Sequence, residues 1–590
     1  MSILVIGEKP SVSRELAKVL GAGTKKKGYI EGNGYIVSWC FGHLVGLKFP
    51  DEYSEKWAEK WSFSQLPMIP DEWKFRISES SKEQFRVLKE LMNSNNVTEI
   101  ICATDADREG ECIFRYVYNL VKCRKPVKRL WISSLEESAV RDGFAKLKSS
   151  SEYDNLYQAG FCRAKADWLV GMNGSRLFSV RYNAHLNTGR VQTPTLAMIV
   201  KRDNDIENFV KQKYFTVDLD IGFRANSRRI DDESEADSLV SSCNGRAVAV
   251  TDVKKEVKSI SAPKLFDLTS LQREANKKFG YTAQQTLDCM QSLYEKKLVT
   301  YPRTDSQYLP DDMEQTAYSL IPEISKNFDF GSVDSPNLKP VINNSKVTGH
   351  HAIIPTESGV TCDISTLAAD EQNILKLVAL RLLCASASAY RYNSVKIRLL
   401  CENTEFTANG KSVLEMGWKV LDGKIGETEK SDKNSLPDLK KGMNFTAKAE
   451  KSGHFTSPPK EFTEDTLLSA MEHAGAEDFD ENAEKKGLGT PATRANTIEN
   501  LVKHGYIERD GKKIISTDKG RNLIKVIPDE VKSAKLTADW ESKLLEVEHG
   551  NLSADNFMNE INSFVTGLVS KYGSADSSVS FGENQPSIGN

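Results

Sequence analysis

The first 150 residues alternate between short apolar runs and amphipathic stretches. Ile3–Ile6 and Val97–Ala103 are apolar runs that predict buried strands. Ser11–Leu20, with Ser11 or Ser13 as its N-cap, and Glu111–Val121 have the spacing of helices. Strands that alternate with helices predict an α/β domain, which places its ligands in loops at the carboxyl ends of the strands.

The pattern changes repeatedly after residue 150. Residues 151–207 have helical periodicity, 214–260 and 391–455 alternate like strands, and 263–390 and the stretch from 456 to Tyr572 are helical again. We interpret the acidic stretch at 231–237 as a solvated loop, and the Gly, Ser and Asn after Tyr572 predict a flexible tail. The order α/β, α, β, α, β, α predicts units that are split in sequence and joined in space.

Composition narrows the class of protein. A chain of 590 residues with 39% apolar and 27% charged residues is typical of several globular domains. It has no apolar run of about 18 residues and no apolar run suited to a signal peptide at its start, so we expect a cytoplasmic protein. Its ten cysteines form no Cys-x-x-Cys pair and are expected to be buried thiols.

The formal net charge of −3 argues weakly against a nucleic-acid function, but the charge is unevenly distributed. Residues 485–525 contain ten Lys and Arg against four Asp and Glu, whereas residues 526–590 contain four against ten. A charged run is more often a solvated face, so this basic segment favours nucleic-acid binding only modestly.

Carboxylates follow both predicted strands of the α/β domain. Asp105, Asp107 and Glu109 come after the second strand, and extended backbone would point all three to one side. Glu8 ends the first strand and would lie near them in a parallel sheet, with Lys9 beside it for a phosphate. A divalent cation would relieve the repulsion, and Mg²⁺ suits few carboxylates plus phosphate oxygens. The alternative is an acidic surface turn paired with neighbouring arginines.

Tyr301 and two histidines form a second group of candidates. A phenol has a pKa near 10, so attack by Tyr301 needs nearby cations, and Arg303 could fork onto a phosphate beside it. His350 or His351 could hold a phosphate oxygen or assist proton transfer. The alternatives are that Tyr301 is a packing residue, as most single tyrosines are, and that the adjacent histidines are structural or bind a metal. No P-loop is present, because Glu405 occupies the first glycine of the nearest candidate.

Three further segments have the residues of phosphate-backbone readers. Asn187–Thr195 combines a glycine turn with Arg190, hydroxyls and an amide. Gly487–Arg494 opens a helix, and Tyr506–Ile515 follows it as a hairpin-like pair within the basic segment.

In their order along the chain, these motifs resemble the type IA DNA topoisomerases, in the topoisomerase III branch, over about residues 1–570. The matching segments are Gly7–Ser11, the Asp105, Asp107 and Glu109 group, Arg163–Gly171, Gly189–Pro194, Tyr301–Ser306, His350–Ile353 and Gly489–Arg494. The lack of Cys₄ zinc ribbons disfavours a topoisomerase I.

The resemblance implies a multidomain fold of α/β, α and β parts, with an N-terminal Toprim domain and a toroidal four-domain core. It implies Toprim at 1–150, a helical DNA-groove domain with a winged-helix-like part at 151–210 and 455–570, and a β-rich gate or hinge domain at 211–262 and 391–454. Residues 263–390 would form the helical domain that carries the nucleophile, and 571–590 the tail.

The resemblance also implies an ATP-independent, Mg²⁺-dependent enzyme. Tyr301 would cleave one DNA strand through a 5′-phosphotyrosine, and strand passage and religation would relax negative supercoils and decatenate DNA. Glu8, Asp105, Asp107 and Glu109 would hold Mg²⁺, and Glu8, Lys9, Arg303 and His350 would assist catalysis. The single-strand groove would contain Arg163, Asp167, Trp168, Asn187, Thr188, Gly189, Arg190, Val191, Gln192 and Thr193.

We expect the partner to be DNA, at single-stranded segments of underwound, gapped or catenated duplex, and a helicase is a candidate second partner. A monomer in the bacterial cytoplasm, associated with nucleoid or plasmid and without membrane contact, is expected. The alternatives are another Toprim enzyme, such as a primase or nuclease, and a non-catalytic single-strand-binding recombination accessory protein.

Overall fold

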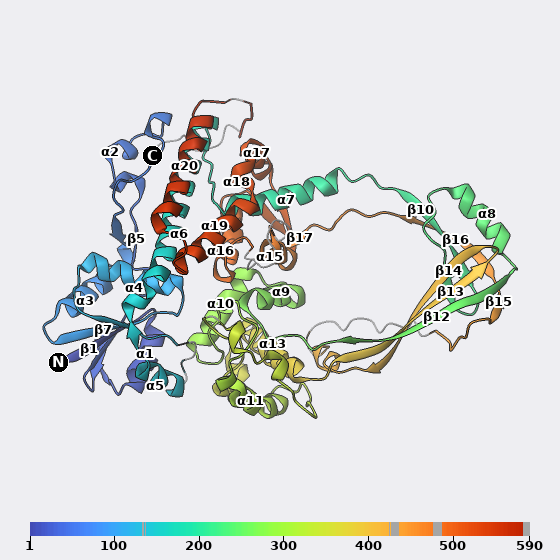
Figure 1. Cartoon of the computed structure of the whole chain (residues 1–590), viewed down its shortest axis with the longest axis horizontal. Coiled ribbons are helices and arrows are strands. Elements are labelled where there is room, and N and C mark those ends of the chain that lie inside the picture. The colour runs from blue at the N-terminus through green and yellow to red at the C-terminus, as the bar shows by residue number, and fades with distance from the viewer. Residues whose placement is uncertain are drawn as a thin grey trace.

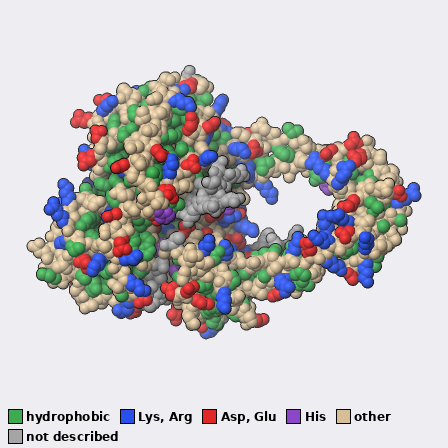
Figure 2. All heavy atoms as spheres, viewed as in Figure 1, with side chains coloured by type: hydrophobic (Ala, Val, Ile, Leu, Met, Phe, Trp, Pro, Cys, Tyr) green, Lys and Arg blue, Asp and Glu red, His purple; other side chains and the backbone are tan. Residues whose placement is uncertain are grey.

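The chain forms an elongated ring. The computed structural model describes residues 1–132, 135, 137–347, 349–423, 425, 436–475, 487–576 and 578–581. A broad body on one side is joined to a β-sheet arm that curves around an opening, which the space-filling view leaves clear (Figures 1 and 2). In these ranges, no helix is both long enough and apolar enough to cross a membrane.

Residues 1–150, the N-terminal unit, form a seven-stranded sheet with helices packed against it. The parallel strand β1 lies between β4 and β7, so the loops after β1 and β7 meet at one edge. In sheet order the strands are β2 (Thr24–Lys26), β3 (Tyr29–Gly32), β4 (Tyr35–Trp39), β1 (Ser2–Gly7), β7 (Val97–Ala103), β8 (Val127–Arg129) and β9 (Lys148–Ser149). The other elements are α1 (Pro10–Val19), α2 (Glu55–Ala58), α3 (Lys82–Asn93), α4 (Arg108–Val121), α5 (Glu137–Ala145), β5 (Val45–Leu47) and β6 (Phe75–Ile77).

The helical unit combines two distant parts of the chain. Its hydrophobic core joins residues 177–200 to residues 462–568, so the chain leaves this unit after the first segment and returns to it at the second. The helices are α6 (Asp154–Tyr182), α7 (Gln192–Glu207), α15 (Glu464–His473), α16 (Pro491–Lys503), α17 (Asp518–Val526), α18 (Asp529–Lys532), α19 (Ala534–Glu548) and α20 (Ala554–Tyr572). A small sheet of β17 (Phe462–Thr463), β19 (Lys513–Ser516) and β18 (Ile507–Asp510) includes the predicted hairpin, with β18 antiparallel to β19.

The β unit is one seven-stranded sheet built from two separated segments. Strand β10 pairs with β16 along its whole length, and β12 pairs with β13, which joins residues 213–260 to residues 390–455. In sheet order the strands are β15 (Asn444–Thr446), β12 (Ala247–Ile260), β13 (Tyr390–Cys401), β14 (Thr404–Glu415), β11 (Arg224–Asn226), β10 (Lys213–Asp220) and β16 (Lys448–Phe455). This sheet forms the arm of the ring (Figure 1).

The tyrosine unit, residues 265–386, is helical and lies between the arm and the N-terminal unit (Figure 1). Its helices are α9 (Leu268–Phe279), α10 (Ala283–Glu295), α11 (Glu314–Asn327), α12 (Glu357–Thr361) and α13 (Ala369–Ser386), and α14 (Lys419–Asp422) packs on α13. The division into domains expected from the sequence, with its boundaries, stays a prediction. All ten cysteines are free, and nine are buried.

Three local predictions were wrong. Helix α1 begins at Pro10 with Lys9 in the N-cap position, because proline fits the first helical turn better than it fits a preceding loop. Residues Glu233–Cys243 form α8 rather than a solvated loop, since Asp232 caps the helix by accepting from the Glu235 amide. The start of the tail is held in place, because Arg181 pairs with Asp576 at 2.9 Å, and residues 577 and 582–590 lie outside the described ranges.

Candidate active site

Two strand ends bring the predicted carboxylates together. The register pairs Gly7 of β1 with Ala103 of β7, so Glu8 and Asp105 emerge side by side. The Asp105 amide donates to a Glu8 carboxylate oxygen at 3.4 Å, and the Asp107 carboxylate caps α4 by accepting from the Gly110 amide at 2.7 Å. The loop from 104 to 107 is therefore fixed at both ends, by the sheet and by the helix.

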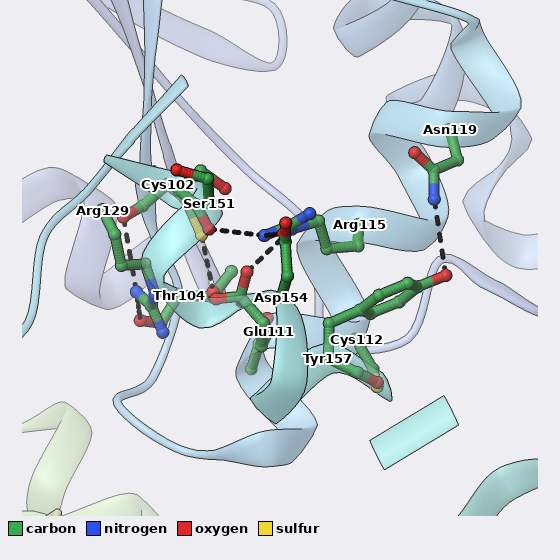
Figure 3. Close-up of polar contacts among 12 residues, drawn as sticks. Cys102, Thr104, Glu111, Cys112, Arg115, Asn119, Arg129, Ser151, Asp154 and Tyr157 are labelled. Atoms are coloured by element: carbon green, nitrogen blue, oxygen red, sulfur yellow. Dashed lines mark hydrogen bonds and ion pairs between the residues drawn. The ribbon is translucent and has the colours of Figure 1, made fainter. Parts of the chain in front are cut away.

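A buried arginine holds this acidic loop from behind (Figure 3). Arg129 at the end of β8 donates to the Thr104 carbonyl at 2.7 Å and to the Asp105 carbonyl at 2.5 Å. Its Nε pairs with buried Glu111 at 3.0 Å, and Glu111 also pairs with Arg115 at 2.8 Å. A satisfied buried ion-pair network fixes backbone position, so Arg129 determines where the Asp105 carboxylate lies. The sequence analysis missed this residue, because its partners are 18 to 27 residues away.

The carboxylates of the loop interact unfavourably with one another. Burial, then the charges of Asp105 and Asp107, hold the pKa of Glu8 well above its usual value. Burial and Asp105 raise the pKa of Asp107 to about 6. The expectation for Glu109 was wrong, because Glu109 lies in the first turn of α4 instead of in extended backbone. Its carboxylate is 3.6 Å from the His43 ring nitrogen, and the hydrogen bond from His43 lowers the pKa of Glu109.

Tyr301 reaches this cluster from the tyrosine unit. Its hydroxyl donates to the Asp105 carboxylate, and its ring is only 6% exposed. The rings of Tyr294 and His350 pack against it, with centroids 5.4 Å and 4.1 Å away. Burial, followed by the charges of Asp105 and Glu8, holds the pKa of Tyr301 well above its usual value, so the phenol is protonated in this closed form.

Cations and histidine surround the tyrosine as the sequence predicted. The Lys9 ammonium lies 5.9 Å from the Tyr301 ring centroid and donates to the Gln291 amide oxygen at 3.2 Å. The Arg303 Nε is buried and makes no hydrogen bond to any residue that the structure describes. A buried donor without a partner is costly, so a phosphate oxygen would satisfy it.

A cavity of about 370 Å³ lies between the N-terminal unit and the tyrosine unit. Asp105, Tyr301, His350 and His351 lie on its wall, together with apolar residues of α1. At the same cavity the two units are joined by an ion pair of Lys297 with Glu15 at 2.5 Å. The nucleophile candidate and the acidic loop therefore belong to opposite sides of one seam.

The donor set fits a hard divalent cation, although it is not arranged as a complete cage. Within the described part of the chain, no three His, Cys, Asp or Glu side chains are grouped closely enough to hold an ion. Buried Glu8 and half-buried Asp105 and Asp107 nevertheless offer oxygen ligands whose mutual repulsion a cation would relieve. Mg²⁺ is commonly held by one or two carboxylates, with waters and substrate phosphates completing its shell, and the site fits that mode.

A second buried cluster joins the N-terminal unit to the helical unit. Arg190 donates to Asp167 at 2.8 Å and to Glu541 of α19 at 2.9 Å, and Arg163 lies 3.6 Å from the same Glu541 carboxylate. Arg108 of α4 approaches Glu541 at 3.6 Å. The nearby arginines, Arg163 first, outweigh the burial penalty and lower the pKa of Glu541 to about 2. Glu541 was missed because it lies 351 residues from Arg190.

Beyond this cluster, the predicted groove residues line a cavity of about 560 Å³. Asn187, Thr188 and Gln192 form one wall, and the Thr188 hydroxyl and the Gln192 amide nitrogen have no hydrogen-bond partner in the described ranges. The same cavity is also lined by aromatic and basic groups that the sequence analysis did not select, namely Trp57, Trp61, Arg176 and His504. Trp61 is stacked 5.0 Å from the Arg176 guanidinium, and such rings suit base stacking.

The remaining groove candidates lie deeper. Trp168 is 7% exposed and donates its indole N–H to the Lys48 carbonyl, so it supports the wall and offers no free ring for stacking. Gly189 and Thr193 form the turn before α7, where the Gly189 amide donates to the Thr193 hydroxyl at 3.0 Å, and half-buried Val191 precedes that helix. Arg494, which belongs to a segment selected as a candidate phosphate-backbone reader, is buried, and its guanidinium donates to the Thr269 hydroxyl at 2.8 Å.

Part of the charge of the basic segment is used in internal ion pairs. Arg509 pairs with Glu499 and Glu464, and Arg521 with Glu207. Lys485 and Lys486 lie outside the described ranges. The excess charge of this segment therefore does not by itself mark a nucleic-acid surface.

Comparison with known proteins identifies similar sequences along nearly the whole chain. A family model described as DNA topoisomerase matches residues 151–559, and a Toprim domain model matches residues 3–135. The chain is 40% identical to DNA topoisomerase 3 of Bacillus cereus over 607 aligned residues, covering 97% of this chain and 82% of the relative. It is 38% identical to DNA topoisomerase 3 of Bacillus subtilis, covering 95% and 80%.

The fold is similar to that of full-length topoisomerase I from Thermotoga maritima. The two chains superpose with a TM-score of 0.72 at 22% sequence identity, over 96% of this chain and 90% of the other. The arrangement of the ring and its Toprim unit is thus shared, while residue roles must be argued from the site itself.

Proposed function

Because the chain belongs to the type IA DNA topoisomerase family, in its topoisomerase III branch, we propose that Tyr301 is the residue that cleaves DNA. Enzymes of this family change DNA topology by cutting one strand, passing another through the break and religating it. The main support for this assignment is the hydrogen bond from the Tyr301 hydroxyl to the Asp105 carboxylate, which brings a tyrosine of the tyrosine unit into contact with the carboxylates of the N-terminal unit.

The reaction exchanges one phosphodiester bond for another. The Tyr301 oxygen bonds to phosphorus as the bond to the 3′-oxygen breaks, leaving a 5′-phosphotyrosine and a 3′-hydroxyl. On attack the phenol proton passes to Asp105, which accepts its hydrogen bond beforehand, and the leaving 3′-oxygen takes up a proton from solvent. Because the phosphotyrosine retains the bond energy, religation is the reverse attack and needs no ATP, in agreement with the missing P-loop.

Cationic side chains stabilise the charge that develops on the phosphate. The unpartnered Nε of Arg303 supplies a donor on the tyrosine side, and Lys9 supplies a point charge on the other. His350, stacked on Tyr301, positions the ring and lies within reach of a non-bridging oxygen. The strand upstream of the cut occupies the groove cavity, where Thr188, Gln192 and the Trp57 and Trp61 rings contact it.

Glu8, Asp105 and Asp107 are the residues that would hold Mg²⁺, with Glu109 at the edge of the group. When bound, the ion would screen the carboxylates from the substrate phosphate and stabilise the phosphate charge. The Arg129 network keeps these ligands in place whether or not the ion is present.

We further propose that the enzyme acts as a monomer in the bacterial cytoplasm, on nucleoid or plasmid DNA. A monomer is supported by the origin of all site residues from one chain. A helicase that exposes single strands is the candidate partner, since the groove takes an unpaired strand. Light scattering of the purified protein tests the monomer, and co-purification with helicases tests the partner.

The test of the reaction uses negatively supercoiled plasmid with Mg²⁺ and without ATP. Tyr301→Phe should abolish relaxation and the covalent adduct trapped by denaturant, and the trapped adduct of the unaltered enzyme should carry the 5′ end of the downstream fragment. Tyr294→Phe is the matched control, because it removes another buried phenol whose ring touches Tyr301. Relaxation by Tyr301→Phe at the normal rate would favour a nuclease or primase instead.

A further inference from the structure

An exposed phenylalanine lies in the loop that follows β4. Phe41 is 56% exposed, more than any other phenylalanine in the part of the chain that the structure describes. It lines neither the cavity between the N-terminal unit and the tyrosine unit nor the groove cavity. Core packing and the two cavities therefore do not explain an aromatic side chain at this position.

The backbone at Phe41 has a conformation that suits glycine better. The φ angles of Phe41 and Gly42 are +57° and +75°. Positive φ at two successive positions is typical of turns in which Gly, Asn or Asp stand. For a bulky side chain such a φ is an outlier that costs free energy. The loop therefore presents an aromatic ring to solvent where glycine would fit at a lower cost.

Hydrogen bonds fix this loop to the end of β1. The Cys40 amide donates to the Gly7 carbonyl at 3.0 Å, and the Gly42 amide donates to the Glu8 carbonyl at 3.1 Å. Cys40 itself is fully buried. Phe41 is thus held between two anchored residues, one position away from a direct contact with the backbone of Glu8.

The same loop contacts the acidic group through His43. The His43 Nε2 atom lies 3.6 Å from the Glu109 carboxylate. His43 contributes most to the lowered pKa of Glu109, and the charges of Arg303 and Arg163 act in the same direction. The Phe41 loop therefore lies beside a carboxylate that is close both to the tyrosine unit and to the groove cluster.

The Phe41 ring has an open face. Its contact with the Trp39 ring is edge-on, with centroids 6.4 Å apart and an interplanar angle of 74°, so at most one face of Phe41 is covered. Gly42 and His43 beside it add no apolar surface, and the loop does not form the extended apolar patch that is typical of a protein-binding site. A single open aromatic face suits a planar ligand.

We propose that Phe41 stacks on an unpaired base of the cleaved strand next to the scissile phosphate, and that it favours a purine there. Every base has a face that stacks on an aromatic ring, and differences in stacking strength give a modest sequence preference. The strained and anchored backbone presents the ring beside Glu8. This inference rests on the proposed function, because it needs a strand held at Tyr301.

A photo-crosslink tests the location of the base. Full-length Tyr301→Phe, which should bind a strand without cutting it, is mixed with single-stranded oligonucleotides that carry 5-iodouracil at one position at a time, within three nucleotides of the cleavage site. This base crosslinks to aromatic rings on which it stacks. The peptide that contains Phe41 should be crosslinked from one or two adjacent positions, with at least fivefold the yield of any other position. Equal yields from all positions would overturn the proposal, and no crosslink to Phe41 would assign the ring to another occupant.

Substitutions separate the ring from its bulk. Phe41→Leu should bind a short single-stranded oligonucleotide about tenfold more weakly, within the range of about 5- to 100-fold for one base stacked on an aromatic side chain, and should lose the purine preference. Phe41→Trp should bind within twofold of normal, because it restores an aromatic face. The control Phe455→Leu removes a phenylalanine of similar exposure, 53%, from the arm and should bind normally. Equal affinities of the two leucine variants would refute the stacking role.

Thermal stability distinguishes this role from a structural one. Phe41→Gly removes the ring together with the strain of the positive φ, which glycine adopts readily. Its affinity for the oligonucleotide should fall as in Phe41→Leu, while its Tm should not fall. A decrease in Tm of more than about 3 °C would show that Phe41 is a packing residue and would overturn the proposal.

The covalent adduct separates this inference from the cleavage mechanism. If the unaltered enzyme forms no adduct with single-stranded DNA, the proposed function fails. If the unaltered enzyme forms the adduct, and Phe41→Leu binds the oligonucleotide as tightly and with the same base preference, only the role of Phe41 fails.

Discussion

Gly110, in the first turn of α4, is where the acidic loop passes closest to the helix. A Cβ added at Gly110 would lie 2.2 Å from the Asp105 carbonyl oxygen and 2.9 Å from its carbon, whereas real Cβ atoms keep at least 3.0 Å. The substitution Gly110→Ala must therefore displace the Asp105 backbone by at least about 0.8 Å, the shortfall between these distances. Arg129 donates a hydrogen bond to the same carbonyl, so moving the Asp105 backbone also strains that hydrogen bond.

The displacement disturbs the hydrogen bond between the Asp105 carboxylate and the Tyr301 hydroxyl. Misplacement of a reacting group by about 1 Å costs about 100-fold in rate, or about 2.7 kcal/mol of barrier. We expect cleavage of a labelled single-stranded oligonucleotide, measured in single turnover with Mg²⁺, to fall by about this factor. Binding of the oligonucleotide should be unchanged, because neither Gly110 nor Asp105 lines the groove cavity.

The matched control is Gly567→Ala in α20, where an added Cβ meets no atom within 4 Å. Alanine is favoured over glycine inside helices by about 1 kcal/mol, so this control should be slightly more stable and fully active. Cleavage by Gly110→Ala within threefold of normal would refute the reasoning. Parallel loss of oligonucleotide binding would also refute it, since the defect would then be general misfolding.

Three other perturbations test two buried ion pairs and the metal ligands. Glu541→Gln should lower the free energy of unfolding at pH 7 by about 3 kcal/mol, because the pKa of Glu541 is lowered to about 2 in the folded protein. That contribution is present above pH about 4.5 and is lost as pH falls toward 2. The difference in Tm between the variant and the unaltered protein, measured by calorimetry, should therefore shrink below pH about 4.5. Arg129→Met should cost about 3–5 kcal/mol in urea unfolding, because buried Glu111 would keep only Arg115 as a partner. Adding Glu111→Leu should recover part of the loss, and no recovery would contradict the pairing. Mg²⁺ should raise the Tm of the unaltered protein, and a chelator should reverse the rise. The double variant Asp105→Asn with Asp107→Asn should not respond to Mg²⁺. An undiminished response in that variant would place the ion elsewhere.

Local patterns predicted the parts of the fold that depend on neighbouring residues. The strand Val97–Ala103 and the hairpin within 506–515 appear at their expected positions, because apolar runs and turn residues determine them locally. Tyr301 could be selected because an arginine two residues away and a stiffening proline suited phosphate chemistry. The helix at Glu233–Cys243 was missed because its acidic composition resembled a solvated loop, while a single cap at Asp232 decides the structure.

The rest of the site depends on pairings between distant parts of the chain. Glu541 meets Arg190 only when α19 packs on α6, and Trp61 faces the groove only when an insertion of the N-terminal unit reaches the helical unit. Periodicity contains no information about such contacts. The direction of the Glu109 carboxylate could not be predicted either, since it changes when α4 begins at Arg108 instead of three residues later.

The seam between Tyr301 and Asp105 has a consequence for the proposed reaction. If the ring opens along this seam, the tyrosine, with one end of the cut strand attached, would move away from the carboxylates and Lys9 that would assist its reversal. On that mechanism the break could reseal only after closure restores the same contact. Closure of the ring would then control religation through the position of one phenolic oxygen.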